Sequence, residues 1–131
     1  MCRFDDQLLN QIWERAKRVD GYDADRFRKD ACGAWIIRDN YGDPDSPFGW
    51  EVDHIYPESK LREKSVPDEL IDNPINLRPL NSKNNASKGA DYPSYQAIIK
   101  SEGNFNIEGV FELTVNEQVR NEVEQLYRDY L

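Results

Sequence analysis

The sequence contains few cysteines, a single histidine and no long hydrophobic run. Cys2 and Cys32 are the only cysteines among 131 residues and form no C-x-x-C pair, which argues against a structural zinc site of the usual spacing. The sequence is compatible with a disulfide between them, although two free thiols in a reducing cytosol are the simpler interpretation. No apolar run approaches the roughly 20 residues that cross a bilayer, and the N-terminus has no apolar signal core. We therefore expect a cytoplasmic protein that makes no membrane contact.

Basic residues are also fewer than acidic ones. The chain has 17 Lys and Arg and 25 Asp and Glu, which gives a net charge of −8. Nucleic-acid-binding proteins are usually basic, since neutralising phosphates supplies much of their affinity. The acids are unevenly spread, however: residues 101–131 hold seven acidic and two basic residues, whereas residues 76–90 hold three basic and no acidic ones. Arg26, Arg28 and Lys29 form a second basic cluster. The charge pattern favours a protein partner at the acidic C-terminal region. It remains compatible with nucleic-acid binding at the basic segments.

A length of 131 residues fits one domain, and the spacing of apolar residues predicts that it is of the α+β class. Apolar side chains recur at helical spacing near residues 5–18, and a second stripe runs from Val119 to Tyr130, where Thr114 and Glu117 have capping-box spacing. Between these helices we expect strands at 34–37, 50–55, 76–80 and 110–115, a loop with one helical turn at 58–74, and a helix from Asn81 or Ser82 to Lys88 that Gly89 ends.

The only histidine, His54, lies at the end of an expected strand and directly follows Asp53. Hydrolysis of a phosphodiester requires a base that takes a proton from water, and a cation that polarises the phosphoryl group. Histidine suits the first task because its unperturbed pKa is ~6.5, whereas carboxylate and amide oxygens suit Mg²⁺. Neighbouring residues on a strand point to opposite faces. Asp53 and His54 can therefore serve one site only if the strand end bends or a helix lies beside it.

The segments Gly49–Ile55 and Asn76–Gly89 resemble the HNH endonucleases, also called ββα-metal or His-Me finger nucleases. The resemblance covers residues 22–93 and is most specific at Asp53-His54 and at Asn85-x-x-Lys88-Gly89. It implies a ββα-metal core of two short antiparallel strands and a helix, with flanking N- and C-terminal helices, as in small bacterial members without zinc-binding cysteines. The chain then divides into an N-terminal helix (1–21), the nuclease core (22–93) and an acidic strand–helix extension (94–131).

Four residues receive roles from this resemblance. Asp53 matches the aspartate that binds the metal, and His54 matches the general base. Asn76 matches the central asparagine, which holds the loop between the strands so that the histidine points correctly. Asn85 matches the third position, a metal ligand. The expected cofactor is one divalent cation, Mg²⁺ or a substitute such as Mn²⁺, with no structural zinc.

DNA is the substrate that the resemblance implies, and basic residues near the motif are candidates for phosphate contacts. They are Lys83 and Lys88 on or beside the expected helix, and Arg78 as a weaker candidate. The competing hypothesis is a non-catalytic or partner-dependent interaction module that retains the HNH fold, since an acidic surface repels DNA and favours basic proteins.

Overall fold

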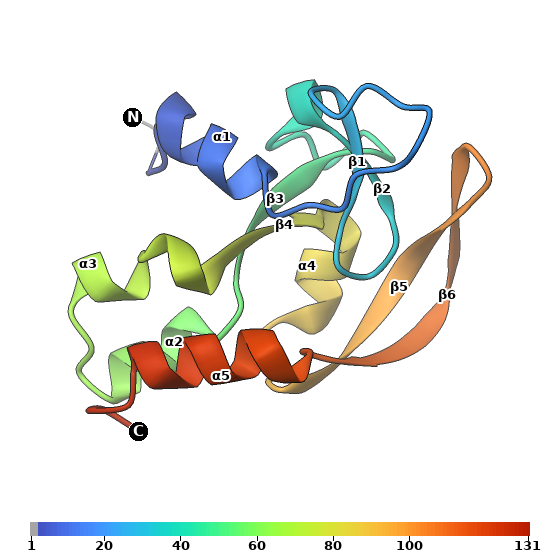
Figure 1. Cartoon of the computed structure of the whole chain (residues 1–131). Coiled ribbons are helices and arrows are strands. Elements are labelled where there is room, and N and C mark those ends of the chain that lie inside the picture. Colours follow the sequence, from blue (N-terminus) through green and yellow to red (C-terminus); the bar gives the residue numbers. More distant parts are fainter. Residues whose placement is uncertain (1–2) are drawn as a thin grey trace.

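The computed structural model describes residues 3–131, which form short helices and three two-stranded antiparallel sheets (Figure 1). This confirms the α+β class. No helix in the described residues is long and apolar enough to cross a membrane. Cys2 lies outside the described residues, and Cys32 is a free thiol. The elements in chain order are α1 (Asp6–Trp13), β1 (Phe27–Lys29), β2 (Trp35–Ile37), η1 (Arg38–Asn40), β3 (Trp50–His54), α2 (Glu58–Glu63), α3 (Asp68–Ile71), η2 (Pro74–Asn76), β4 (Leu77–Asn81), α4 (Ser82–Lys88), β5 (Ser94–Glu102), β6 (Phe105–Thr114) and α5 (Glu117–Leu126).

The strands β3 and β4 pair antiparallel, and α4 follows β4 without a loop. The helix begins at this point because the side chain of Asn81 caps it, accepting a hydrogen bond from the backbone N of Lys83 at 3.0 Å. It ends at Gly89, whose φ of 52° is readily adopted only by glycine. The predicted strand pair and helix are therefore confirmed, and α4 contacts both strands.

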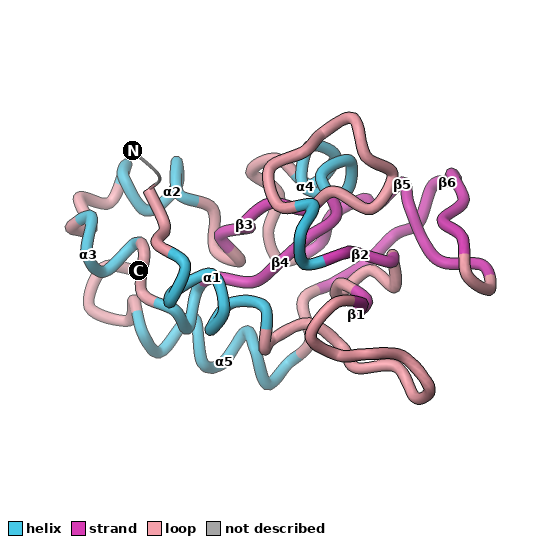
Figure 2. The backbone as a smooth tube through the Cα atoms, turned by 90° about the horizontal axis from the view of Figure 1, so that it is seen from above, coloured by secondary structure: helices cyan, strands magenta, loops and turns pink. Residues whose placement is uncertain are grey.

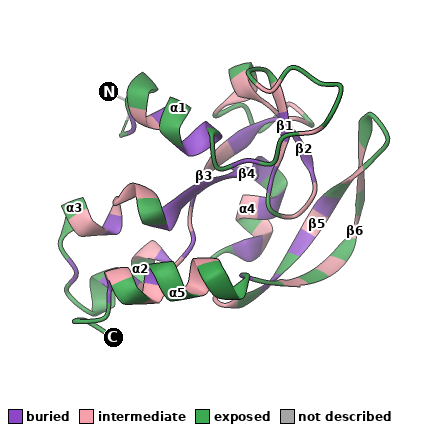
Figure 3. Ribbon diagram, in the orientation of Figure 1, coloured by how far each residue is buried: buried purple, intermediate pink, exposed green. Residues whose placement is uncertain are grey.

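Two hydrophobic clusters lie on either side of this strand pair. Trp50, at the start of β3, belongs to the cluster under α1, whereas Ile55, just beyond the end of β3, belongs to the cluster under α5. Figure 3 shows the burial along β3, β4 and α4 that results. His54 lies where the chain passes from one cluster to the other, so packing on both sides fixes its backbone. The predicted C-terminal stripe is confirmed in part: Val123 on α5 and Tyr127 just after it are fully buried, whereas Tyr130 is exposed.

Asp30 joins the β1–β2 hairpin to the start of α4. Its carboxylate is fully buried and accepts hydrogen bonds from the backbone N of Cys32 (2.9 Å), Ala34 (2.8 Å) and Asn81 (2.9 Å), and from Nδ2 of Asn84 (3.2 Å). Buried polar groups need such partners, because an unsatisfied one costs about 1–3 kcal/mol. Asp30 therefore fixes the position of α4 from outside the strand pair.

Several elements differ from the prediction. The first helix ends at Trp13 instead of near residue 18, because Lys17 leaves it to exchange two backbone hydrogen bonds with Lys29, at 2.8 and 3.0 Å. The C-terminal helix is capped by Asn116, which accepts a hydrogen bond from the backbone N of Val119 at 2.9 Å, and so the predicted capping box at Thr114 is wrong.

The segment at 58–74 is also more ordered than a loop with one helical turn. It contains α2, α3 and the start of η2. Helix α2 has one buried apolar residue, Leu61, and an ion pair of 2.7 Å between Glu58 and Arg62, so its sequence gives little helical periodicity. Strand β5 was not predicted, and it pairs with β6 in a hairpin that lies at the opposite end of the molecule from α2 and α3 (Figure 2).

Candidate active site

A cavity of about 350 Å³ lies beside the end of β3. Asp53, His54 and Asn85, three of the residues that the sequence singled out, line it together. Asp53 and His54 are neighbours on β3, and Asn85 comes from α4, which lies beside the strand as this arrangement requires. The full lining consists of Arg3, Phe4, Val52, Asp53, His54, Pro57, Glu58, Ser59, Asn85, Gly89 and Ala90.

The imidazole of His54 lies between two carboxylates. Its Nε2 is 2.8 Å from Oδ1 of Asp72, and its Nδ1 is 3.8 Å from Oε1 of Glu58. An ionised carboxylate only accepts hydrogen bonds, so the neutral ring carries its proton on Nε2 and its lone pair on Nδ1. Since 3.8 Å is too long for a hydrogen bond, Glu58 does not form a hydrogen bond with Nδ1.

Arginines hold both carboxylates ionised. Arg3 donates to Asp72 at 2.7 and 3.0 Å and to Glu58 at 3.0 Å, and Arg62 donates to Glu58 at 2.7 Å. Partial burial acts to raise the pKa of Glu58, but the hydrogen bonds from Arg3 and Arg62 overcome it and lower that pKa to about 2. The pKa of Asp72 is lowered as well, because bonds from Arg3 and His54 outweigh burial. His54 therefore faces two anions at neutral pH.

Asn76 holds the chain immediately after His54. Its side chain is fully buried and clamps the backbone of Tyr56, accepting from N at 2.7 Å and donating to O at 3.1 Å. Its own carbonyl accepts a hydrogen bond from the N of Ile55 at 2.8 Å. Arg15 supports it from α1's side, donating to the carbonyls of Pro74, Ile75 and Leu77 at 2.6–3.0 Å. Asn76 thus fixes the backbone just after His54, and its role in orienting the histidine stays a prediction.

The two asparagines in the middle of α4 face different ways. Asn84 is fully buried and bonds to Asp30 and to the backbone of Ile98 and Ile99 on β5, so its role is structural. Asn85 lines the cavity, and its Nδ2 donates to Oε1 of Glu51 at 3.4 Å. The amide oxygen of Asn85 is then the atom that could bind a cation.

Asp53 is buried beside two cations. Its Oδ2 accepts from Nε of Arg78 at 2.9 Å, directly across the strand pair, and its Oδ1 lies 3.2 Å from Nζ of Lys88. Nζ of Lys88 also donates to the carbonyl of His54 at 3.2 Å. Burial lowers the pKa of Lys88, against the opposing effect of Asp53. The carboxylate of Asp53 thus forms ion pairs with two buried cationic side chains.

This pairing corrects the expectation that Arg78 and Lys88 contact phosphates. The Lys88 side chain is 0% exposed and that of Arg78 is 9% exposed, and both are directed at Asp53. A phosphate on the surface cannot reach them. Lys83 is 51% exposed and pairs with Glu108 at 3.2 Å, so it is the one predicted basic contact that the structure leaves at the surface.

The cavity offers oxygen donors from three elements: Asp53 on β3, Glu58 on α2 and Asn85 on α4. Carboxylate and amide oxygens are the donor types that Mg²⁺ takes, but a cation here has to compete with Arg78 and Lys88 for Asp53 and with Arg3 and Arg62 for Glu58. No group of three His, Cys, Asp or Glu side chains that could hold a metal occurs within residues 3–131. A cation in the cavity would therefore depend on the amide of Asn85 and on water.

Sequence reasoning missed Arg3, Glu58 and Asp72. Arg3 and Asp72 are 69 residues apart, and nothing in local spacing links them. Glu58 follows His54 by four residues, but this spacing predicts a contact only when one helix carries both residues, and His54 lies on a strand. Comparisons of the chain with protein-family models, curated proteins and solved structures find no match.

The ion pairs around Arg3 predict a specific sensitivity to acid. Glu58 and Asp72 have folded pKa values below their ordinary values of 4.5 and 3.8. Their contribution is complete above those values and is lost as the pH falls from about 4.5 towards 2. We expect Arg3→Met to weaken this dependence, by up to about 1 kcal/mol for such partly exposed pairs.

Urea unfolding followed by circular dichroism between pH 7 and pH 2 measures this dependence. Arg18→Met is the matched control, because Arg18 pairs at 3.4 Å with Glu14, on a side chain that is 57% exposed. Equal pH dependence for Arg3→Met and the wild-type protein would contradict the prediction.

Proposed function

We propose that this protein is a divalent-metal-dependent endonuclease of the HNH type that hydrolyses phosphodiester bonds in DNA. The observation that supports this best is the meeting of Asp53, His54 and Asn85 around one cavity, with the histidine oriented by Asp72 at 2.8 Å. In this proposal, β3, β4 and α4 form the ββα-metal core, and the other helices supply the packing that zinc-binding cysteines supply in many members of the family.

His54 is the general base in this mechanism. Its Nδ1 takes a proton from a water in the cavity, the water oxygen attacks phosphorus, and the bond from phosphorus to the 3′-oxygen breaks. The 3′-oxygen leaves with the electron pair of that bond and takes a proton from solvent. Asp72 fixes the ring orientation through Nε2, and Asp72 and Glu58 together stabilise the imidazolium that forms. A divalent cation, when bound by Asp53 and Asn85, supplies polarisation of the phosphoryl group and stabilisation of the departing oxygen. Asn76 contributes by holding the strand end that carries His54.

The carboxylates that line the cavity already have cationic partners. Asp53 is paired with Arg78 and Lys88, and Glu58 is paired with Arg3 and Arg62. In the proposal a divalent cation therefore competes with these side chains for carboxylate oxygens, and its contribution is to polarise the phosphoryl group.

The cleavage of supercoiled plasmid tests this proposal. The protein is incubated at low salt with Mg²⁺, Mn²⁺, Ca²⁺ or Zn²⁺, or with EDTA, beside the His54→Ala protein as a control for contaminating nucleases. We expect nicked or linear DNA with Mg²⁺ or Mn²⁺, none with EDTA, and at least a roughly hundredfold slower reaction with the variant. Cleavage that persists in EDTA, or at an equal rate in the variant, would overturn the assignment.

A second candidate function is a non-catalytic interaction module that binds a basic protein. It is favoured by the exposure of most acids in residues 101–131, since Glu108 on β6 and Glu117 and Glu122 on α5 are exposed. Acidic surfaces of this kind attract basic partners at long range. The absence of cleavage with every divalent cation in the plasmid assay would favour this function over the nuclease.

A further inference from the structure

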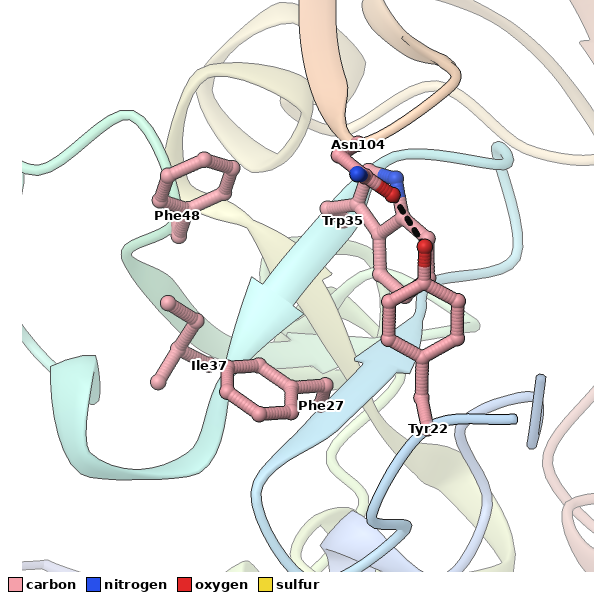
Figure 4. Close-up of a pocket in the computed structure, with 6 residues that line it drawn as sticks. All are labelled: Tyr22, Phe27, Trp35, Ile37, Phe48 and Asn104. Carbon is pink, nitrogen blue, oxygen red and sulfur yellow. Dashed lines mark hydrogen bonds between the residues drawn. The ribbon is translucent and has the colours of Figure 1, made fainter. Parts of the chain in front are cut away.

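A second cavity, of about 230 Å³, lies between the β1–β2 hairpin, the loop that precedes it and the turn between β5 and β6 (Figure 4). It shares no lining residue with the candidate active site. Its lining is five apolar or aromatic side chains and one amide: Tyr22, Phe27, Trp35, Ile37, Phe48 and Asn104.

The aromatic side chains of this cavity form a rigid wall and an exposed edge. Trp35 is only 5% exposed and is fixed by a hydrogen bond of 2.7 Å from Nε1 to the carbonyl of Gly103. Tyr22 is 40% exposed, and its ring centroid lies 4.6 Å from that of Trp35 at an interplanar angle of 52°. In Figure 4 the side chains surround an open space. The volume is below the roughly 300–1,000 Å³ of sites for drug-sized ligands, so it suits a single planar ring.

Polar groups at the edge of the cavity restrict its ligand further. Lys29 Nζ lies 4.9 Å from the ring centroid of Trp35, and Arg26 Cζ lies 5.5 Å from that of Phe27. Asn104 Oδ1 accepts a hydrogen bond from the Tyr22 hydroxyl, which leaves the amide nitrogen to donate to a ligand. The loop that precedes β1 also carries acidic residues at positions 20, 23 and 25. Their negative charges offset the positive charges of Arg26 and Lys29. Selectivity here must therefore come from the ring of the ligand more than from its phosphate.

We infer that this cavity binds one unstacked base of a single-stranded stretch of nucleic acid. Stacking of a base on aromatic side chains tolerates any sequence, because every base has a π-face. The choice of nucleic acid rests on the proposed nuclease function. The site also explains how a chain of net charge −8 holds its substrate: part of the affinity comes from stacking, which needs no excess of basic residues.

Binding is tested on the His54→Ala protein in EDTA, so that neither cleavage nor a metal takes part. Fluorescence anisotropy compares a short labelled oligothymidylate with an abasic strand of the same length, which carries the same phosphates without bases. We expect the base-bearing strand to bind roughly 5- to 150-fold more tightly. Tyr22→Ala should reduce this ratio severalfold, whereas Tyr22→Phe, which keeps the ring and loses only the hydroxyl contact, should retain it.

The location is tested by nuclear magnetic resonance. Titration with thymidine monophosphate should shift the indole N–H signal of Trp35. The signals of Trp13 and Trp50, which are buried together in the cluster beside α1, should stay in place. Equal affinity for the two strands, an unaffected ratio in Tyr22→Ala or an unmoved Trp35 signal would each overturn the inference. A protein that cleaves plasmid but binds both strands equally would overturn this inference alone, whereas base-dependent binding without any cleavage would support it and contradict the nuclease proposal.

Discussion

The His54→Ala protein is expected to cleave DNA about 10²- to 10⁴-fold more slowly than the wild-type protein, which is the usual contribution of a positioned general base. The fold should survive this change. His54 is the last residue of β3, and other contacts fix the chain that follows it, namely the Asn76 clamp on Tyr56 and the packing of Ile55. Single-turnover cleavage of a labelled duplex measures the rate, and circular dichroism confirms the fold.

Two further measurements separate a catalytic role of His54 from a structural one. Added imidazole should restore part of the rate of His54→Ala, because the missing ring leaves a space beside Asp72 and Glu58. Asp72→Asn should lower kcat at least about tenfold with little change in KM, since Asp72 orients the ring through Nε2 at 2.8 Å and does not line the cavity. A variant that imidazole fails to rescue, and a change confined to KM in Asp72→Asn, would together remove His54 from the role of base.

The sequence predicts the strand–strand–helix unit well because its signals are local. Asn81 and Gly89 mark the two ends of α4 by their capping chemistry, and these bounds agree with the structure. Sequence reasoning also reached Asp53, His54 and Asn85, which line one cavity. The DNA substrate and the metal stay predictions, because only the family resemblance implies them.

The environment of these residues could not be read from the sequence, because it depends on distant parts of the chain. The sequence predicts that Lys88 contacts phosphates from a place on or beside the helix, yet its side chain is buried and lies 3.2 Å from Asp53 on β3. The same holds for the partners of His54: Asp72 follows α3, and Arg3 lies near the N-terminus. Local patterns place a side chain on an element but do not show which charges tertiary packing brings to it.

The largest expected effect on stability comes from Asp53. Asp53→Asn leaves Arg78 and Lys88 buried without their anion, and an uncompensated buried charge of this kind costs about 3–5 kcal/mol. Lys88→Met should cost within about 1 kcal/mol, because Asp53 keeps its bond of 2.9 Å to Arg78 and the methionine fills a similar volume. The double variant should therefore be more stable than Asp53→Asn alone. Urea unfolding of the three variants measures these differences, and wild-type stability in Asp53→Asn would contradict the account.

The same variants decide whether Asp53 binds the cation. The Lys88 ammonium, 3.2 Å from Oδ1 of Asp53, competes with any divalent ion at that carboxylate. Removal of this ammonium in Lys88→Met should raise the affinity for Mn²⁺ by at least about tenfold. Unit charges about 4 Å apart interact by roughly 4 kcal/mol at an effective dielectric constant near 20. A tenfold change in affinity corresponds to only about 1.4 kcal/mol. Lys83→Met, at an exposed lysine of the same helix that pairs with Glu108, should change it little. Calorimetric titration with Mn²⁺ measures both variants. Equal affinity for Mn²⁺ in Lys88→Met and Lys83→Met would place the cation away from Asp53. A gain in affinity in Lys88→Met alone would show that this buried lysine weakens metal binding at Asp53. The same lysine donates to the carbonyl of His54 and so helps to hold the strand end that carries the histidine.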